Sequence, residues 1–357
     1  MKYIVSAGGT AGHIYPALAI IDFIKESDSK ADILYIGTHN RMEKDIVPKK
    51  NIEYKELEMY GLKRSISFKN IKVAAKFIKS IKAARKIIRD FKPDIVIGTG
   101  GYVTAPVIYA AKKEGIKTII HEQNSELGLT NKYLSKYADK IFVSFEKMVD
   151  LFPKNKAIFT GNPCSESIKV RKPGDKKALG LSENKKLVLI VMGSLGSKRM
   201  NETITAMLPL FNNKDYEVLY VTGKEYYSDK LSFAGNIHVV DFYDNSLLKR
   251  VDVMVSRAGA TTMSEIISLK IPSILVPSPY VTNNHQLKNA TYLKSSGACI
   301  IIEEKDLVGD VLVREVDRLI GTKKYYSDIK KSLENFESPR CSEIIIDEIN
   351  SLLGRKI

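Results

Sequence analysis

Short apolar runs alternate along this chain with longer segments of helical periodicity. In the first half the apolar runs are typical of buried strands, and they occupy residues 2–7, 32–37, 94–97, 117–120 and 140–143. Helices are indicated at 14–25 and 71–91. In the second of these, apolar residues recur near every 3.6 positions, at Ile71, Ala74, Ala75, Ile78, Ile81 and Ile88. Strands that alternate with helices predict a parallel sheet covered on both faces.

A second series of apolar runs begins after a polar segment. Its members lie at residues 187–192, 216–221, 238–240, 251–255 and 273–276. Between the two series lie Gly161-Asn162-Pro163 and the polar stretch 169–183, which we take as the linker. We therefore expect an α/β protein with domains at 1–160 and 161–340 and a C-terminal helix at 341–357 that packs back on the first domain. Two doubly wound, Rossmann-like domains would face each other across a cleft, with ligands at the carboxyl ends of the strands.

The composition agrees with two globular domains. A length of 357 residues is about twice that of a usual domain, and 44% hydrophobic content is ordinary for a globular protein. No apolar run approaches the roughly 20 residues that a spanning helix needs, and residues 1–6 are too short for a signal peptide. Three cysteines without a CxxC pair fit a reducing cytosol, and they fit neither a disulfide framework nor a zinc site.

Positive charge is concentrated in one segment. The formal net charge is +15, and residues 63–92 hold 11 Lys or Arg side chains with Asp90 as the single acidic one. Such a stripe attracts polyanions, either nucleic acid or an anionic lipid surface, although a solvated helix face would look the same. No helix-turn-helix, RNP-like motif or basic patch with interleaved aromatics supports a nucleic-acid binder.

Four turns that contain glycine follow predicted strands, at residues 8–13, 98–102, 193–197 and 257–262. Glycine lets backbone N–H groups approach an anion, and the start of the following helix adds partial positive charge. Tight turns in α/β proteins use glycine in any case, so a single turn is weak evidence. None matches G-x-G-x-x-G or the Walker pattern, which argues against dehydrogenases and P-loop NTPases.

Several polar residues close these turns. His13 lies at the end of the first turn, where an imidazole is suited to act as a general base, although a lone histidine is often only a helix-terminal polar group. Glu265 falls near the start of a helix. Its carboxylate would either accept hydrogen bonds from ribose hydroxyls or complement the helix dipole. The amides of residues 283–289 suit sugar hydroxyls, as would those of an ordinary polar loop. The sequence holds no Asp-x-Asp and no histidine pair with metal spacing, so we expect no metal.

These motifs together resemble the MurG family of lipid I N-acetylglucosaminyltransferases, which belongs to glycosyltransferase family 28 and has the GT-B fold. The resemblance covers nearly the whole chain and keeps the family's order. Its points are GGTAGHIYPALAI at 8–20, GTGGYVTAP at 98–106, HEQNSELGLTNK at 121–132, TGNP at 160–163, MGSLGS at 192–197, SRAGATTMSE at 256–265 and NNHQLKNA at 283–290.

The resemblance implies an inverting, metal-independent enzyme without a cofactor that moves GlcNAc from UDP-GlcNAc to lipid I in peptidoglycan synthesis. The first domain would receive lipid I, with His13 as the base and Asn124 beside the reacting sugars. The second would hold UDP-GlcNAc, with Glu265 on the ribose. The implied donor contacts are Thr10, Ala11, Gly12, Asn124, Ser194, Tyr243, Arg257, Ala260, Thr261, Thr262, Met263, Ser264, Glu265, Gln286 and Asn289.

The chain departs from the family pattern at three points. Ala11 stands for a common glycine, Leu195 for a frequent glutamine, and Cys164 and Ser165 follow the GNP turn where some members have an arginine that helps to bind diphosphate. The diphosphate contact would then come from Arg257 or from backbone alone. Two alternative enzyme functions stay open: a diacylglycerol-dependent glycolipid synthase and a UDP-GlcNAc 2-epimerase.

The acceptor's lipid tail implies work at the cytoplasmic face of the cell membrane, as a peripheral protein. The helix predicted at 71–91 is the expected docking element on the anionic inner-membrane surface. Its lysines would reach lipid headgroups, and two apolar side chains that lie off the predicted core stripe would insert among them. The docking residues are Lys72, Val73, Lys76, Phe77, Lys79 and Lys82.

Overall fold

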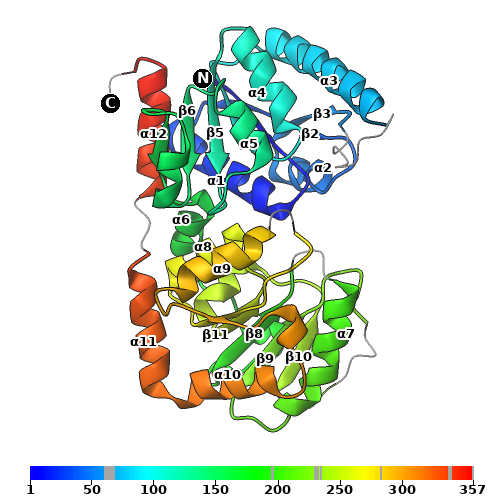
Figure 1. Cartoon of the computed structure of the whole chain (residues 1–357), viewed down its shortest axis with the longest axis vertical. Helices are drawn as coiled ribbons and strands as arrows, with labels where there is room; N and C mark the ends of the chain where they lie inside the picture. Colours follow the sequence, from blue (N-terminus) through cyan, green and yellow to red (C-terminus); the bar gives the residue numbers. More distant parts are fainter. Residues whose placement is uncertain are drawn as a thin grey trace. The chain divides into compact units, whose positions relative to one another are not determined.

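A computed structural model of the chain describes residues 1–59, 69–193, 197–228, 233, 235–281, 284–336 and 340–355, with the backbone alone described for 69–75. Two compact units are formed, each around its own sheet (Figure 1). The first unit is Met1–Glu166 with Ser338–Ile357, and the second is Ser167–Glu337. The break between them falls within helix α6 (Pro163–Val170), which the sequence did not predict.

The described residues of the first unit form a seven-stranded parallel sheet in the order β3-β2-β1-β4-β5-β6-β7. The strands are β1 (Lys2–Ala7), β2 (Asp32–Thr38), β3 (Glu53–Leu57), β4 (Ile95–Gly100), β5 (Lys117–Glu122), β6 (Lys140–Val143) and β7 (Ala157–Phe159). The order reverses between β1 and β4, where Tyr3 pairs with Ile95. In doubly wound sheets ligands bind outside the carboxyl ends of the strands at this switch point.

Helices cover both faces of this sheet. They are α1 (Ala11–Ser27), α2 (Glu43–Ile46), α3 (Lys69–Phe91), α4 (Thr104–Lys113), α5 (Leu129–Leu134) and α12 (Cys341–Leu352). Tyr3, Val5 and Ala7 of β1 share a buried cluster with α1 and α12. Ile4 is fully buried too, and it faces the opposite side because successive strand residues alternate. Helix α3 packs beside α4, and α4 packs on β4 and β5 (Figure 1).

The C-terminal helix α12 is part of the first unit. Cys341, Ile345 and Ile349 recur at intervals of four residues and are buried in the same core as α1. At its start, the Ser342 hydroxyl donates to the Glu166 carboxylate at 2.5 Å, and the Ser342 N–H donates at 2.8 Å. Apolar residues repeated every four positions form the single buried stripe of a surface helix.

The described residues of the second unit form a six-stranded parallel sheet in the order β10-β9-β8-β11-β12-β13. The strands are β8 (Leu187–Val191), β9 (Glu217–Val221), β10 (Ile237–Val240), β11 (Val253–Ser256), β12 (Ser273–Leu275) and β13 (Ile300–Ile301). The helices are α7 (Lys198–Met207), α8 (Ala260–Leu269), α9 (His285–Lys294), α10 (Val311–Gly321) and α11 (Lys323–Glu334). The order reverses between β8 and β11, so the strand ends that precede the two predicted glycine turns of this unit are neighbours at its switch point.

The predicted helix at 71–91 is confirmed as α3, and its predicted core stripe is right at Ile88 but wrong at Ile78. Ile78 is 56% exposed, whereas Ser80, Ala84 and Ile88 are buried. The small Ser80 lets the helix approach β3, because its hydroxyl donates to the Glu58 carbonyl at 3.1 Å. Ile78 is therefore an exposed apolar side chain of α3, whereas Phe77 is half-buried. Ile71, Ala74 and Ala75 lie outside the described side chains.

No helix in the described part of the chain combines the length and the apolar character that crossing a bilayer demands.

Candidate functional site

The glycine turn after β1 leads directly into α1 at the switch point of the first sheet. Gly8 N–H donates to the Gly100 carbonyl at 3.2 Å, and Gly9 N–H donates to Glu43 Oε2 at 3.1 Å. Among the hydrogen bonds of the described residues, none is donated by the backbone N–H groups of Thr10, Ala11 and Gly12. The first N–H groups of a helix have no partner within it and favour an anionic or oxygen-rich ligand.

His13 lies in the first turn of α1 with its ring over Gly100. Its Nδ1 is 3.0 Å from Thr10 Oγ1 and 3.3 Å from the Gly8 carbonyl oxygen. A Cβ at Gly100 would collide with the imidazole ring, so glycine is needed there. In the neutral tautomer that donates from Nδ1 to Gly8, the lone pair is on Nε2, and this is the form that can accept a proton.

The turn after β4 is tied to the first turn. Gln123 donates to the Gly12 carbonyl at 2.9 Å and to the Thr99 carbonyl at 2.8 Å. The Thr99 hydroxyl donates to the His13 carbonyl at 2.7 Å. Gly101 has a φ of 86°, and a Cβ there would collide with the Gly8 carbonyl oxygen. Side chains at the carboxyl ends of β4 and β5 thus hold the backbone at the start of α1, where His13 lies.

Asn124 is positioned by Glu122, which lies two residues before it in the sequence. Glu122 is buried, and its Oε1 accepts the backbone N–H and the side-chain amide of Asn124, each at 3.1 Å. Its Oε2 accepts Asn131 Nδ2 at 2.9 Å and Gly128 N–H at 3.1 Å. Burial raises the pKa of Glu122, while the donated hydrogen bonds oppose that rise. Burial lowers the pKa of His121 to about 4, so this histidine is neutral near pH 7.

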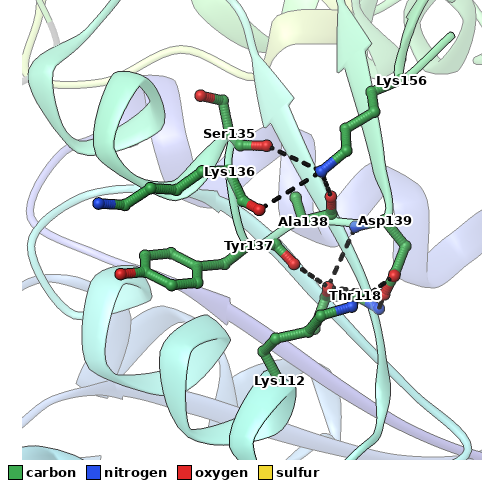
Figure 2. Close-up of polar contacts among 8 residues, drawn as sticks. All are labelled: Lys112, Thr118, Ser135, Lys136, Tyr137, Ala138, Asp139 and Lys156. Atoms are coloured by element: carbon green, nitrogen blue, oxygen red, sulfur yellow. Dashed lines mark hydrogen bonds and ion pairs between the residues drawn. The ribbon is translucent and has the colours of Figure 1, made fainter. Parts of the chain in front are cut away.

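Helix α5, which carries Asn131, is held at its other end by polar contacts (Figure 2). Lys156 Nζ donates to the carbonyl oxygens of Ser135, Lys136 and Ala138, the last at 2.8 Å. Below them, Asp139 accepts from Thr118 and pairs with Lys112 at 2.7 Å. A lysine at a helix C-terminus satisfies carbonyls that have no helical partner. The helix that orients Glu122 is therefore anchored at both ends.

In the second unit, the start of α7 is supported by a residue that sequence reasoning missed. Asn201 is buried and donates to the carbonyls of Ser197 at 3.0 Å and Thr222 at 3.1 Å. Its side-chain oxygen Oδ1 also accepts a hydrogen bond from the Tyr220 hydroxyl. Gly193 has a φ of 109°, as the turn requires. Ser194 and Leu195 lie outside the described residues.

The turn after β11 leads into α8, which begins at Ala260. Met263 is fully buried in the core and the Ser264 hydroxyl donates to the Ala260 carbonyl, so these two side chains hold the helix. The hydroxyl oxygen of Thr261 is buried and, among the described residues, has no hydrogen-bond partner. Buried polar atoms are normally satisfied, which makes this hydroxyl a candidate ligand contact, as are the backbone N–H groups of Ala260, Thr261 and Thr262.

Glu265 lies one turn into α8 and is 6% exposed. Its Oε1 accepts the side-chain amide of Asn245 at 2.8 Å, a contact that the sequence did not predict. Burial raises the pKa of Glu265 to about 7, against the lowering influence of Arg171 and of Asn245. The carboxyl group is thus held in one orientation and changes charge near neutral pH.

Arg257 is held by its own unit. Its guanidinium pairs with Glu304 at 2.8 Å and donates to the Val276 carbonyl at 3.1 Å. Glu304 also pairs with Arg199 at 3.4 Å, and Arg199 donates to the Tyr280 hydroxyl at 2.7 Å. Arg257 is 9% exposed, so its charge is already satisfied within this network. Arg199 is the more exposed of the two cations.

The remaining predicted donor contacts also belong to the second unit. Asn289 is fully buried and donates to the Ala258 carbonyl at 3.2 Å, which ties α9 to the turn before α8. Gln286 Oε1 accepts the Ser278 N–H at 2.8 Å, so one end of that amide is engaged. Tyr243 packs on the hydrophobic core beside Phe242, which is 66% exposed.

The described residues gather no three His, Cys, Asp or Glu side chains in an arrangement that would hold a metal ion.

Comparison with known proteins shows similarity along the whole chain. A profile of the "Glycosyltransferase family 28 N-terminal domain" matches residues 3–143, and one of the "Glycosyltransferase family 28 C-terminal domain" matches 187–342. A Bacillus licheniformis protein is 45% identical over 361 residues, which cover 99% of each chain. Its name is "UDP-N-acetylglucosamine--N-acetylmuramyl-(pentapeptide) pyrophosphoryl-undecaprenol N-acetylglucosamine transferase".

Solved structures share the fold. The crystal structure of Acinetobacter baumannii MurG matches with a TM-score of 0.75 at 24% identity, covering 98% of this chain and 99% of that one. A UDP-GlcNAc 2-epimerase from Neisseria meningitidis, bound to UDP-GlcNAc, matches with a TM-score of 0.66 at 18% identity, covering 98% and 100%. Both matches extend over two Rossmann-like domains, so the fold is GT-B. From the two profile matches and the 45% identity over its whole length, the chain belongs to glycosyltransferase family 28.

Proposed function

We propose that this enzyme transfers GlcNAc from UDP-GlcNAc to the 4-hydroxyl of MurNAc in undecaprenyl-diphosphoryl-MurNAc-pentapeptide, lipid I. The products are β-1,4-linked lipid II and UDP. The observation that carries the proposal is full-length identity of 45% to a relative named for this transfer. The hydrogen-bonded setting of His13 at a sheet switch point supports it, because the reaction needs a base at such a ligand-binding edge.

In the first unit, His13 acts as the general base. Donation from Nδ1 to the Gly8 carbonyl leaves Nε2 as the basic atom of the ring, and this atom takes the proton from the attacking MurNAc hydroxyl. The C–O bond to UDP breaks as the new C–O bond forms on the opposite face, so the anomeric configuration inverts. Asn124, held by Glu122, orients the reacting sugars through its amide.

In the second unit, the turns after β8 and β11 receive UDP-GlcNAc. Glu265 accepts the ribose hydroxyls through the oxygen that Asn245 does not occupy. The Thr261 hydroxyl and the N–H groups that begin α8 stabilise charge on the departing diphosphate. A preorganised donor of this kind contributes about 3–4 kcal/mol to the transition state. Arg199, on α7, is the more exposed of the two arginines that pair with Glu304.

The acceptor is fixed in a bilayer by its lipid, so we place the enzyme on the cytoplasmic face of the cell membrane as a peripheral protein. Helix α3 is its docking element. Lys79 and Lys82 are exposed, as is the apolar Ile78. Lys76 pairs with Glu58 at 3.1 Å, so part of its charge is neutralised. Lys72 and Val73 remain predicted members of this surface, but their side chains lie outside the described ones.

An epimerase is the alternative that the shared architecture raises, since a UDP-GlcNAc 2-epimerase has the same two-domain fold. An identity of 18% supports the fold alone, whereas the sequence motifs of the first unit favour the transferase. A nucleic-acid binder has no motif in its support.

The test is release of UDP from UDP-GlcNAc with different acceptors. We expect UDP release that depends on a short-chain lipid I analogue, with little release when diacylglycerol replaces it or when no acceptor is present. Conversion of UDP-GlcNAc to its 2-epimer without any acceptor would instead establish the alternative. Equal release with diacylglycerol would identify a glycolipid synthase.

A further inference from the structure

A buried carboxylate lies behind the first glycine turn, at the carboxyl ends of β1 and β2. Glu43, the first residue of α2, is fully buried. Its Oε1 accepts the Thr38 N–H at 3.0 Å and the Thr38 hydroxyl at 2.6 Å, and its Oε2 accepts the Gly9 N–H at 3.1 Å. One side of the carboxylate therefore holds the sheet, and the other holds the turn.

The surrounding backbone is shaped to admit this side chain. A Cβ at Gly8 would collide with the Glu43 carboxylate, and a Cβ at Gly37 would press on the Glu43 Cγ. Among the described residues, no ion pair to Glu43 is formed, so the carboxylate is held by hydrogen bonds. Burying an acidic side chain is costly unless it is well hydrogen-bonded, and an apolar residue would fill the same space at less cost.

The effect of this carboxylate on the turn is specific. The carboxylate accepts a hydrogen bond from the Gly9 N–H, and the Gly100 carbonyl accepts one from the Gly8 N–H. The next three N–H groups, of Thr10, Ala11 and Gly12, begin α1 and are the proposed substrate contacts. We propose that Glu43 is a positioning residue that fixes the turn so that these N–H groups and His13 meet the substrate in one geometry. This inference rests on the proposed function for what the turn binds, and on contacts within one unit for how it is held.

Glu43→Gln separates the two sides of the carboxylate. An amide has one oxygen, and the two donors of Thr38 fix that oxygen at the Oε1 position. The NH₂ group then faces the Gly9 N–H, and two donors repel each other. The matched control is Thr38→Val, which removes a hydrogen bond from the opposite side of the same carboxylate and leaves Gly9 bonded.

The experiment measures both variants in two ways. In hydrogen–deuterium exchange, which needs no substrate, we expect faster exchange of residues 8–13 in Glu43→Gln than in Thr38→Val at comparable melting temperatures. In turnover with UDP-GlcNAc and a lipid I analogue, kcat/KM should fall by about 10- to 100-fold in Glu43→Gln, because small misplacements of reacting groups carry penalties of that size. The Kd of UDP alone should not change, since its proposed ribose and diphosphate contacts lie in the second unit.

The outcomes separate the two claims. If exchange of residues 8–13 is the same in both variants, or if both lose turnover equally, Glu43 has only a structural role and the inference is wrong. If the wild-type enzyme transfers no GlcNAc, the proposed function fails. The exchange measurement then still decides whether Glu43 fixes the turn.

Discussion

The side chains around the first switch point are of two kinds. Some act on substrate, and others hold in place the residues that do. His13 and Asn124 belong to the first kind in the proposed reaction. Gln123 and Glu122 belong to the second, because their hydrogen bonds end on the Gly12 carbonyl and on Asn124. The distinction matters for mutagenesis, since loss of an acting group affects kcat directly and loss of a supporting group affects geometry first.

Replacing His13 with alanine tests the base. We expect kcat to fall by about 10²–10⁴-fold, because general-base catalysis contributes that much. UDP affinity, measured by calorimetric titration, should be nearly unchanged because the ring acts only as the proton leaves. Near-normal turnover at saturating substrate would remove His13 from the mechanism.

Glu265 gives a pH dependence with a defined sign. Burial raises its pKa to about 7, so the carboxyl is mostly protonated at pH 6 and mostly ionised at pH 8. Only the ionised form accepts hydrogen bonds on every free lone pair, so donor affinity should rise with pH across this window. The rise should be about five- to tenfold, the difference between a neutral and a charge-assisted hydrogen bond.

The measurement is the Kd of UDP at pH 6, 7 and 8 for the wild type and for Glu265→Gln. UDP titrates in the same range, and the amide variant corrects for this because it retains only the ligand's own dependence. Parallel profiles for the two proteins would show that Glu265 does not meet the ribose.

At the element scale, α3 shows how a helix can be predicted correctly while part of its buried face is missed, since Ile88 is buried as predicted and Ile78 is not. Its periodicity favoured a core stripe through Ile78, but the helix buries Ser80 and Ala84 instead. Small residues permit close helix packing, and a hydrophobicity pattern gives them little weight. The strands β3, β7 and β13 were missed for a related reason. Each lies at a sheet edge, and β3 (Glu-Tyr-Lys-Glu-Leu) has mostly exposed side chains.

The exposed lysines of α3 provide the test of docking. Changing Lys79, Lys82 and Lys86 to Glu should weaken co-sedimentation with anionic vesicles on the order of 100-fold, at about 1 kcal/mol for each lysine. The control changes Lys323, Lys324 and Lys331 of α11 to Glu, which alters net charge equally on the second unit. Turnover of a detergent-soluble acceptor should survive in both. Equal vesicle binding by the two variants would show that α3 is an ordinary solvated helix and not the docking element.

At the scale of the whole molecule, the first unit is discontinuous in sequence, because α12 returns to it after the second unit is complete. The alternation of strands and helices was enough to predict both doubly wound sheets, and the ordered motifs were enough to predict the family. The contacts of Glu43, Asn201 and Asn245 could not be predicted from the sequence. Each is a polar residue in a polar segment, and each has a partner far along the chain (Gly9, Thr222 and Glu265, respectively), so no local pattern marks these contacts.

Ile345→Ala tests how far the first unit depends on α12. Ile345 is fully buried, and truncation of a buried isoleucine costs about 2–5 kcal/mol. The midpoint temperature of thermal unfolding of the first unit should fall, while the second unit should still bind UDP. Ile344→Ala, which truncates a half-buried residue on the same helix, should cost much less. Equal effects of the two changes would place α12 outside the core of the first unit.

The measurement that tests the central claim most directly is the structure of the transfer product. UDP-GlcNAc and a short-chain lipid I analogue should give a single disaccharide, and NMR spectroscopy should show a β-1,4 linkage between GlcNAc and MurNAc. That result requires attack by the 4-hydroxyl with inversion at the anomeric carbon, as proposed for His13. An α-linked product, a linkage to another hydroxyl, or hydrolysis of UDP-GlcNAc without any disaccharide would contradict the proposed reaction.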